Sequence, residues 1–193
     1  MVSLLVERST QSPRPWLTSP WLRLGIPLLL QMGILVTIPA PKAYTLATGT
    51  PILLQTVPVD PYDLLRGRYV TLDYRIAQPE TLQKLSGWSS ELYDQPYIYV
   101  TLTPGSQASD AWIPMAVSAQ KPLSLAANQQ VIRGQWLYGR LDFGLGQYFM
   151  PEDIGDPLEA DLRRFPDEAR AEVKVDRHGG SALVNVWVQD RRY

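Results

Sequence analysis

The stretch EVKVDRHGGSALVNVWVQ, residues 172–189, carries the pattern that decides the fold class. Apolar and polar residues alternate in its two arms, 172–176 and 181–189, and the arms flank the tetrapeptide RHGG. A period of two is typical of a β-strand with one buried face, and glycines between two such arms favour a tight turn. The stretch therefore predicts an antiparallel β-hairpin.

The same alternation recurs outward from this hairpin. Further candidate strands occupy residues 52–59, 68–76, 97–103, 111–118 and 130–144. In the second of these, one face carries the apolar side chains Val70, Leu72, Tyr74 and Ile76. So many short strands predict a mainly β fold, an antiparallel sandwich or open barrel with one or two short helices.

Helical signals are few. Asp156, Pro157 and Glu159 combine a capping acid, a proline at the first helical position and an acid at the third, which predicts a helix over 157–165. Residues 80–87 are a second candidate helix. The core of the β domain is expected to include Trp112, Trp136 and Trp187.

The composition excludes several classes of chemistry. The chain has 193 residues, no cysteine and one histidine, His178. The lack of cysteine excludes disulfides, a thiol nucleophile and thiolate zinc or iron–sulfur sites. One histidine excludes a multi-histidine metal site, and a net charge of −1 does not support nucleic-acid binding. We predict no cofactor, no metal and no nucleic-acid partner.

The segment before the β domain is apolar. The eighteen residues from Leu24 to Pro41 carry no charge, and as a helix they would span roughly 27 Å, close to the hydrocarbon core of a bilayer. Trp21 precedes this run and Tyr44 follows it, where aromatic residues favour the membrane interface. The pattern predicts one transmembrane anchor over residues 22–41.

Charge sets the expected orientation. Residues 1–43 carry four basic side chains and one acidic side chain, whereas the rest of the chain is net negative. Because positive charge is retained in the cytoplasm, we expect residues 1–21 to be a cytoplasmic tail. Residues 42–51 would then be a short linker, and residues 52–193 a periplasmic or lumenal β-rich domain.

Two other interpretations of the apolar run remain open. A cleaved signal peptide needs small residues one and three positions before the cut. Cuts after Ala40 or Ala43 place Ile38 or Pro41 at the third position, which fits poorly. A buried core helix is the last alternative, although eighteen uncharged residues are long for one.

The most distinctive stretch is VPVDPYDLLRGRYVTLDYRI, residues 57–76. Asp60 is a candidate helix cap, and Pro61 and Asp63 suit the first and third helical positions, so a single helical turn is predicted. Gly67 would end the turn in a conformation that glycine adopts easily. The apolar side chains of this turn, which we expect to fill the core, are Leu64 and Leu65.

This stretch resembles a family of uncharacterised bacterial membrane-anchored proteins named for the motif GDYXXLXY. The residues that resemble the family here are Asp60, Pro61, Asp63, Leu64, Leu65, Arg66, Gly67, Tyr69, Leu72 and Tyr74. A second block, FGLGQYFMPEDIGDPLEADL at residues 143–162, resembles the family at Tyr148, Phe149, Pro151 and Glu152. Arg68 replaces the aspartate of the motif, which reverses the charge at that position.

The resemblance implies a short anchor in a bacterial membrane, an extracytoplasmic β-rich domain and no established activity. Members of the family are thought to accompany multi-pass membrane proteins, which implies a partner in the membrane rather than a substrate. We therefore expect an accessory or binding module of a membrane complex, and not an enzyme.

A small envelope hydrolase is the alternative from another class. Its carboxylates would be Asp60, Asp63 and Glu152, with Asp73 as a further candidate. Helix capping explains the spacing of Asp60 and Asp63 equally well, and we expect Asp73 to pair with Arg75 on a solvated strand face. A secreted ligand-binding domain, released by signal cleavage, is the third alternative.

Other kinds of site have less support. A membrane-anchored serine–lysine peptidase would carry a serine two positions before a methionine, and the chain has no such pair. His178 adjoins two glycines in the predicted hairpin turn, where we expect it to be exposed. Asp153, Asp156 and Glu159 lack the spacing of a calcium-binding loop.

Aromatic residues mark a candidate binding face. Tyr97 and Tyr99 share one face of a predicted strand, and Tyr69 is a third member of the candidate face. Cover by a helix or loop is the alternative for these side chains. We also expect Arg66 to pair with Glu152 and so to join the two blocks that resemble the family.

Overall fold

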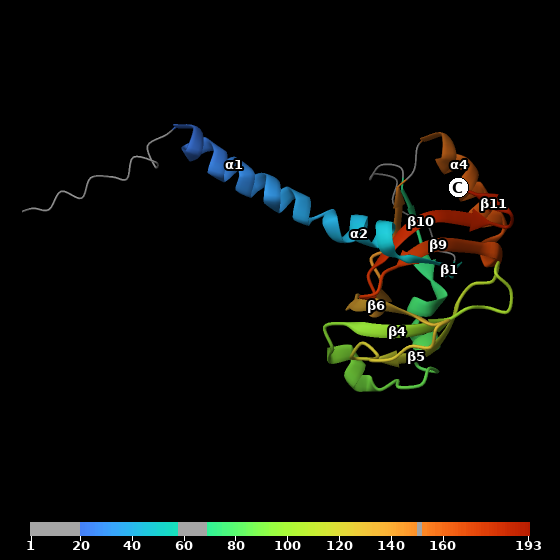
Figure 1. Cartoon of the computed structure of the whole chain (residues 1–193). Helices are drawn as coiled ribbons and strands as arrows, with labels where there is room; N and C mark the ends of the chain where they lie inside the picture. The colour runs from blue at the N-terminus through green and yellow to red at the C-terminus, as the bar shows by residue number, and fades with distance from the viewer. Residues whose placement is uncertain (1–19, 58–68, 150–151) are drawn as a thin grey trace, which may run out of the picture. The chain divides into compact units, whose positions relative to one another are not determined.

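The computed structural model of the chain describes residues 20–57, 69–149 and 152–193 (Figure 1). The chain divides into two compact units, and the boundary lies between Ala40 and Pro41. The second unit, called the β unit here, contains all of the strands in the described residues.

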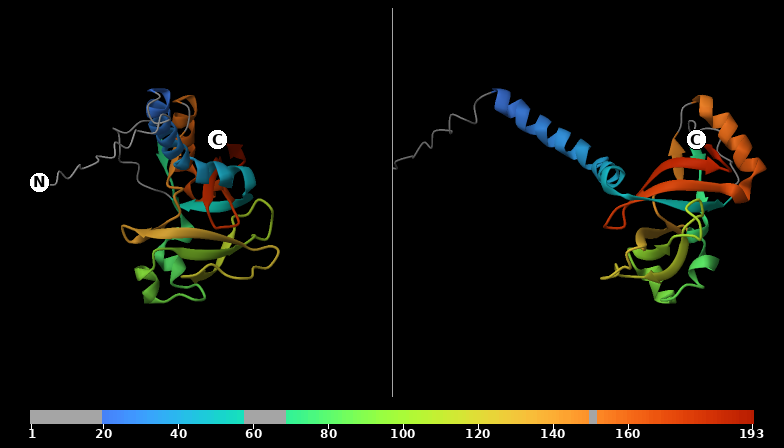
Figure 2. Two further views of the ribbon diagram at one scale, coloured as in Figure 1. Left: turned by 60° about the vertical axis from the view of Figure 1, so that its left-hand side comes forward. Right: turned by 45° about the vertical axis from the view of Figure 1, so that its right-hand side comes forward.

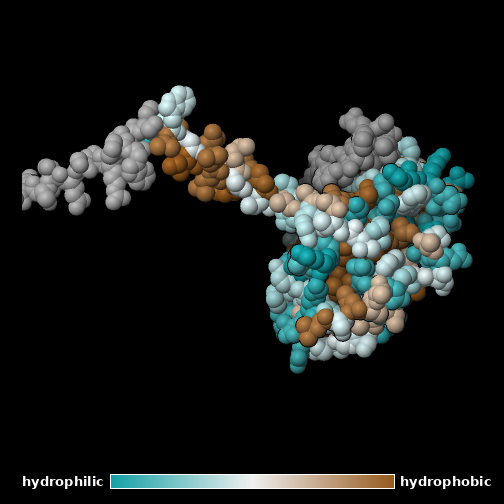
Figure 3. All heavy atoms as spheres, viewed as in Figure 1, coloured by the Kyte–Doolittle hydropathy of each residue, from teal (hydrophilic) through white to brown (hydrophobic). Residues whose placement is uncertain are grey.

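Helix α1, Pro20–Thr37, is apolar and exposed. Its hydrophobic side chains form the brown helix in Figure 3, and Leu29 for example is 73% exposed. In the described part of the chain, no single helix is long and apolar enough to cross a bilayer. Trp21–Thr37 and Ala40–Thr48 meet the criteria of length and composition together, as a bent pair. The transmembrane anchor therefore stays a prediction.

Residues 42–51, predicted as a short linker, are largely helical in the structure. Helix α2 covers Ala40–Thr48, and the first strand begins at Thr50. Thr45 is buried in the β unit, where its hydroxyl donates a hydrogen bond of 2.5 Å to Asp176 Oδ2. The small polar residues of this segment are typical of a linker, but the tertiary contact stabilises them as a helix.

The larger sheet has five antiparallel strands in the order β11-β10-β9-β1-β3. Their bounds are Thr50–Val57 for β1, Asp73–Tyr74 for β3, Ala169–Val175 for β9, Ser181–Val188 for β10 and Arg191–Arg192 for β11. Strands β9 and β10 form the predicted hairpin, with Ser181 opposite Val175. Gly179 in the turn has a φ of +83°, which disfavours any residue with a Cβ.

The second sheet has four antiparallel strands in the order β5-β4-β6-β7. Their bounds are Ile98–Thr103 for β4, Ile113–Ser118 for β5, Gln130–Leu137 for β6 and Arg140–Asp142 for β7. A separate antiparallel pair joins β2, Tyr69–Thr71, to β8, Gln147–Phe149. Figures 1 and 2 show the two larger sheets as layers, with β9 and β10 in orange and red on one side and β4 and β5 in green and yellow on the other.

The two larger sheets enclose one core and are also joined through the backbone. Both sheets contribute to a single hydrophobic cluster, which includes Ile52, Leu54, Val173, Val186, Ile98, Val100 and Ile132. Trp112 N, just before β5, donates to Leu53 O in β1 over 2.7 Å, and Arg133 N in β6 donates to Gly179 O over 2.8 Å. The prediction of a mainly β, antiparallel fold is confirmed.

The three tryptophans expected in the core differ in their environments. Trp112 and Trp136 are partly buried and pack against the core cluster. Trp187 is also partly exposed, and its indole N–H donates a hydrogen bond of 3.2 Å to Glu172. Trp187 therefore lies on the polar face of β10, where a tryptophan needs a partner for its N–H.

The helical elements of the β unit are short. Their bounds are Pro79–Leu82 for α3, Glu152–Arg164 for α4, and Arg75–Ala77, Ser90–Asp94 and Pro166–Glu168 for the 3₁₀ turns η2, η3 and η4. The second candidate helix, 80–87, is helical only at its start, in α3.

Several predicted elements have different bounds from those expected, among them the strand over 130–144, which is divided into β6 and β7. The strand predicted over 68–76 is interrupted, because β2 ends at Thr71 and the short β3 is followed directly by η2. The helix predicted to begin at Pro157 begins at Glu152, so Asp156 is not its cap. Pro157 lies inside α4, where it removes one backbone hydrogen bond of the helix.

Candidate functional site

The two blocks that resemble the family lie side by side. Strand β2 from the first block pairs with β8 from the second, with Tyr69 opposite Phe149 and Thr71 opposite Gln147. Beyond β2, Leu72 N donates to Gly146 O over 3.0 Å and extends the contact. Segments that are distant in sequence therefore build one local structure.

Tyr74 links these two blocks to the core. Its side chain is only 3% exposed, and its hydroxyl donates a hydrogen bond of 3.0 Å to Leu145 O. Burial, together with the charges of Asp73 and Asp142, raises the pKa of the Tyr74 hydroxyl far above its ordinary value. This tyrosine stays protonated and acts as a buried donor, and Leu72 beside it is a core residue.

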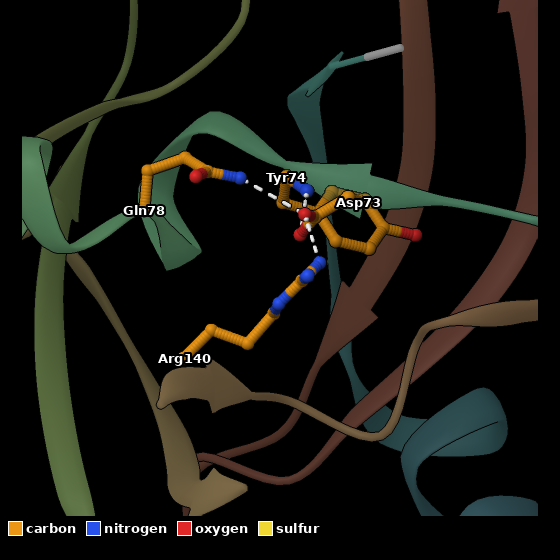
Figure 4. A network of polar contacts seen from close by, with 4 residues as sticks. All are labelled: Asp73, Tyr74, Gln78 and Arg140. Atoms are coloured by element: carbon orange, nitrogen blue, oxygen red, sulfur yellow. Dashed lines mark hydrogen bonds and ion pairs between the residues drawn. The ribbon is translucent and has the colours of Figure 1, made fainter. Parts of the chain in front are cut away.

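Asp73 lies at the centre of a polar cluster (Figure 4). Its Oδ1 accepts a hydrogen bond of 2.8 Å from Tyr74 N, and its Oδ2 accepts one of 2.9 Å from Gln78 Nε2. Arg140 of β7 donates to the same Oδ2 over 2.6 Å and completes an ion pair. The expected pairing of Asp73 with Arg75 is wrong, because the fold brings Arg140 to this carboxylate instead.

A groove of about 950 Å³ opens beside this cluster. Its walls come from α2, from the residues around β3, from the turn between β6 and β7, and from the segment before β8. The polar side chains in its walls include Lys42, Asp73, Arg140 and Asp142. The apolar side chains include Leu46, Leu137, Tyr138 and Leu183.

Lys42 fixes α2 against one wall of the groove. The residue as a whole is exposed, but its ammonium donates hydrogen bonds of 2.9 Å to Gly144 O and 2.6 Å to Ser181 O. Burial of the ammonium lowers the pKa of Lys42, and the nearby charge of Asp142 partly opposes this shift. The ammonium thus serves as a clamp between α2 and the β unit.

The second block is tied to the last residue of the chain. Tyr148 in β8 donates its hydroxyl to Tyr193 O over 2.9 Å, and burial raises the pKa of this hydroxyl. Asp161 of α4 accepts hydrogen bonds from the Tyr193 hydroxyl and from Arg191, and these bonds lower the pKa of the Asp161 carboxyl. These contacts hold β8, α4 and β11 together.

Comparison with known proteins identifies the family. The family model described as GDYXXLXY protein matches residues 31–186. The chain belongs to the GDYXXLXY family. The match includes both blocks, so the resemblance found in the sequence is confirmed. No curated protein and no solved structure shows a significant match to this GDYXXLXY protein.

Part of the family motif lies outside the described residues. This applies to Asp60, Pro61, Asp63, Leu64, Leu65, Arg66 and Gly67 of the first block and to Pro151 of the second. Of Tyr69, Phe149 and Glu152, the structure describes the backbone alone. The pair of Arg66 with Glu152 and the carboxylates of the hydrolase alternative therefore stay predictions, although the pairing of β2 with β8 does bring the two blocks together.

The three tyrosines of the candidate binding face belong to two different sheets. Tyr99 is in β4, and Tyr97 is the residue just before that strand begins. Tyr69 belongs to the separate β2–β8 pair. Tyr97 is 38% exposed, and the guanidinium of Arg133 lies 4.7 Å from the centre of its ring. Tyr99 is partly exposed and lies opposite Arg133 in the sheet.

The hairpin turn of this GDYXXLXY protein is a structural element. His178 is exposed, and its Nε2 accepts a hydrogen bond of 3.1 Å from Arg177 Nε. Asp176 accepts bonds from the backbone N–H groups of His178 and Gly180, at 2.7 Å and 3.0 Å. In the described residues, no group of three or more acidic or histidine side chains is placed to hold a metal ion.

Sequence reasoning missed several residues of the groove. Arg140 and Gln78 had no recognisable pattern, because their role depends on contact with Asp73 from other elements. The sequence shows Lys42 as a basic residue without any sign of its carbonyl partners. Its position one residue after the apolar run was the available signal, since a cation there must either enter water or find carbonyl partners.

Proposed function

We propose that this GDYXXLXY protein is a membrane-anchored extracytoplasmic binding module that associates with a multi-pass membrane protein. The observation that carries the proposal is the direct join between the uncharged run and the β unit. The run ends at Pro41, and α2 already belongs to the β unit through Lys42 and Thr45. The chain therefore enters the β unit at the residue where the proposed anchor ends.

In this proposal residues 22–41 form the anchor, residues 1–21 stay in the cytoplasm, and the β unit faces the periplasm or an equivalent lumen. The uncharged composition of residues 24–41, the exposed apolar side chains of α1 and the basic N-terminal charges support this topology. The β unit is then an antiparallel sandwich or open barrel, in which the backbone bonds of Trp112 and Arg133 join the two larger sheets.

Binding fits the described polar groups better than catalysis does. Asp73 already accepts three hydrogen bonds, and the Lys42 ammonium already donates two to backbone carbonyls. A general acid or base needs a site from which it can exchange a proton with a substrate. The charged groups of Asp73 and Lys42 instead stabilise the fold through these bonds.

The outer face of β4 and β6 is the proposed contact for the partner. Tyr97, Tyr99 and Arg133 gather there, on the side opposite the buried aliphatic residues Ile98, Val100 and Leu102 of β4. Tyrosine and arginine are enriched at the centres of protein interfaces, because they combine a large contact area with directional hydrogen bonds. The arginine stacked on Tyr97 also holds that ring in place before the partner arrives.

Affinity purification of the full chain from native membranes in mild detergent tests this proposal. We expect a stoichiometric multi-pass protein to co-purify with the wild type, and the double variant Tyr97→Ala/Arg133→Ala to lose most of it. Tyr93→Ala is the matched control, because Tyr93 is also an exposed aromatic, at 44%, but packs with Trp88 and Trp136 elsewhere. A wild-type chain that purifies alone would contradict the proposed function.

A further inference from the structure

The turn between β6 and β7 exposes two large apolar side chains. Tyr138 is 95% exposed and Leu137 is 47% exposed, and both lie at the wall of the groove. We propose that this turn inserts into the headgroup region of the bilayer that holds the anchor, as a second membrane contact of the β unit. The inference rests on the proposed anchor and adds a lipid-binding surface to it.

The backbone of Tyr138 is a first argument for a role at this surface. Leu137 pairs with Arg140, so Tyr138 and Gly139 form a two-residue turn, with φ values of 50° and 80°. Such turns favour asparagine, aspartate or glycine at the first central position, and a bulky residue with a positive φ is strained. Because the ring is almost fully exposed, packing within the chain does not account for a tyrosine at this position.

The position of the turn is a second, independent argument. Lys42 and Leu46 of α2 line the same groove as Leu137 and Tyr138. Lys42 follows Pro41, the last residue of the uncharged run, by a single Cα–Cα step of about 3.8 Å. If the run ends at the membrane surface, the wall of the groove begins there as well.

The chemistry of the rim matches a membrane interface. Tyrosine favours the headgroup level, since its ring is apolar and its hydroxyl stays hydrated. Leu46 and Tyr44 of α2 are exposed as well, at 41% and 39%. Arg140 directly follows the turn; one of its guanidinium nitrogens pairs with Asp73, but the side chain is still 57% exposed and can also donate to lipid phosphates. A bilayer containing anionic lipid is therefore the occupant to which this surface is assigned.

Site-directed labelling is straightforward because the chain contains no cysteine. Tyr138→Cys would be labelled with an environment-sensitive fluorophore in the full chain, reconstituted in nanodiscs of phosphatidylcholine and phosphatidylglycerol. Leu123→Cys is the control for water, because Leu123 is fully exposed in the loop between β5 and β6. Leu30→Cys in α1 is the control for lipid.

We expect the label at position 138 to show blue-shifted emission and a quenching by lipid-borne quenchers several-fold stronger than at position 123. A label at 138 that stays in water would overturn the inference. A label shielded from both lipid and aqueous quenchers would overturn it too, in favour of a protein partner on the turn. If position 30 shows strong lipid quenching, the anchor stands in either case; if position 30 is also in water, the anchor itself fails.

Discussion

Asp73 holds three elements together through one carboxylate. It accepts hydrogen bonds from β3, from Gln78 after η2 and from Arg140 in β7. Its own side chain is 14% exposed, whereas that of Arg140 is 57% exposed. Removal of Asp73 leaves the N–H donors of Tyr74 and Gln78 without an acceptor, which is costly in a partly buried place. Removal of Arg140 costs less, because water can solvate the remaining charge.

This asymmetry gives a first prediction. Asp73→Ala should lower the free energy of unfolding by about 1–3 kcal/mol, because it deprives Tyr74 N and Gln78 of their acceptor. Arg140→Gln should lower it by less than about 1 kcal/mol, since exposed ion pairs are weak. Urea unfolding followed by tryptophan fluorescence measures both, and a larger loss for Arg140→Gln would contradict the central role of the carboxylate.

Tyr138 leads to the opposite expectation for stability. Tyr138→Asn should raise the free energy of unfolding by about 1 kcal/mol, because asparagine tolerates a positive φ better than tyrosine. Tyr138→Val is the matched control and should lower it, since a β-branched residue fits this conformation worst. Thermal unfolding of the full chain tests the pair, and an unchanged or lowered melting temperature for Tyr138→Asn would argue against strain.

At the scale of elements, the contact between α2 and the β9–β10 hairpin shows how a polar segment becomes structured. Asp176 is only 6% exposed and accepts hydrogen bonds from Thr45 and from two backbone N–H groups of the turn. Burial opposes its ionisation, but the bonds from Thr45, His178 and Gly180 together outweigh it and lower the pKa of the carboxyl. One carboxylate thus closes the hairpin and docks α2.

The lowered pKa predicts the pH dependence of this element. A carboxyl that is more acidic in the folded state contributes stability above its unfolded pKa, near 3.8, and loses it as the pH falls through the lower folded pKa. The stability difference between wild type and Asp176→Asn should therefore be largest above pH ~5 and shrink below pH ~3.8. Unfolding curves across this range test it, and a difference independent of pH would contradict it.

At the scale of the whole molecule, hydrophobic residues serve two separate purposes. The core cluster of the β unit is buried, whereas the apolar residues of α1 are exposed along the helix. An exposed apolar surface of that size is unfavourable in water and calls for a bilayer or a protein partner. Insertion of α1 into a bilayer, as proposed for the anchor, would supply that environment.

The corresponding prediction concerns the retained N-terminus. Intact-mass measurement of the purified chain should show that residues 24–41 are present, and the chain should stay in the membrane pellet after carbonate extraction. The double variant Leu29→Lys/Leu30→Lys should release it, because charges in the middle of a span are costly, while Leu123→Lys in an exposed loop should not. A mature chain that begins at Tyr44 would show cleavage instead.

The outcome for individual residues shows how far sequence patterns reach. The alternation over 172–189 was sufficient for the hairpin, and the alternation over 68–76 correctly placed Leu72, Tyr74 and Ile76 in the core. The same alternation failed to show the break into β2, β3 and η2. The reason is that a strand can change its partner without any change in the alternation of apolar and polar residues. The start of α4 was misplaced because Pro157 is tolerated inside that helix.

The sequence by itself determined the mainly β fold, the apolar run and the family, since periodicity, uncharged length and short motifs are local properties. Tertiary structure alone decided that β2 pairs with β8, that Arg140 reaches Asp73, and that Lys42 and Thr45 join α2 to the β unit. These contacts link residues that are far apart in the chain. Their free energy depends on burial and geometry, which exist only after the sheets have packed.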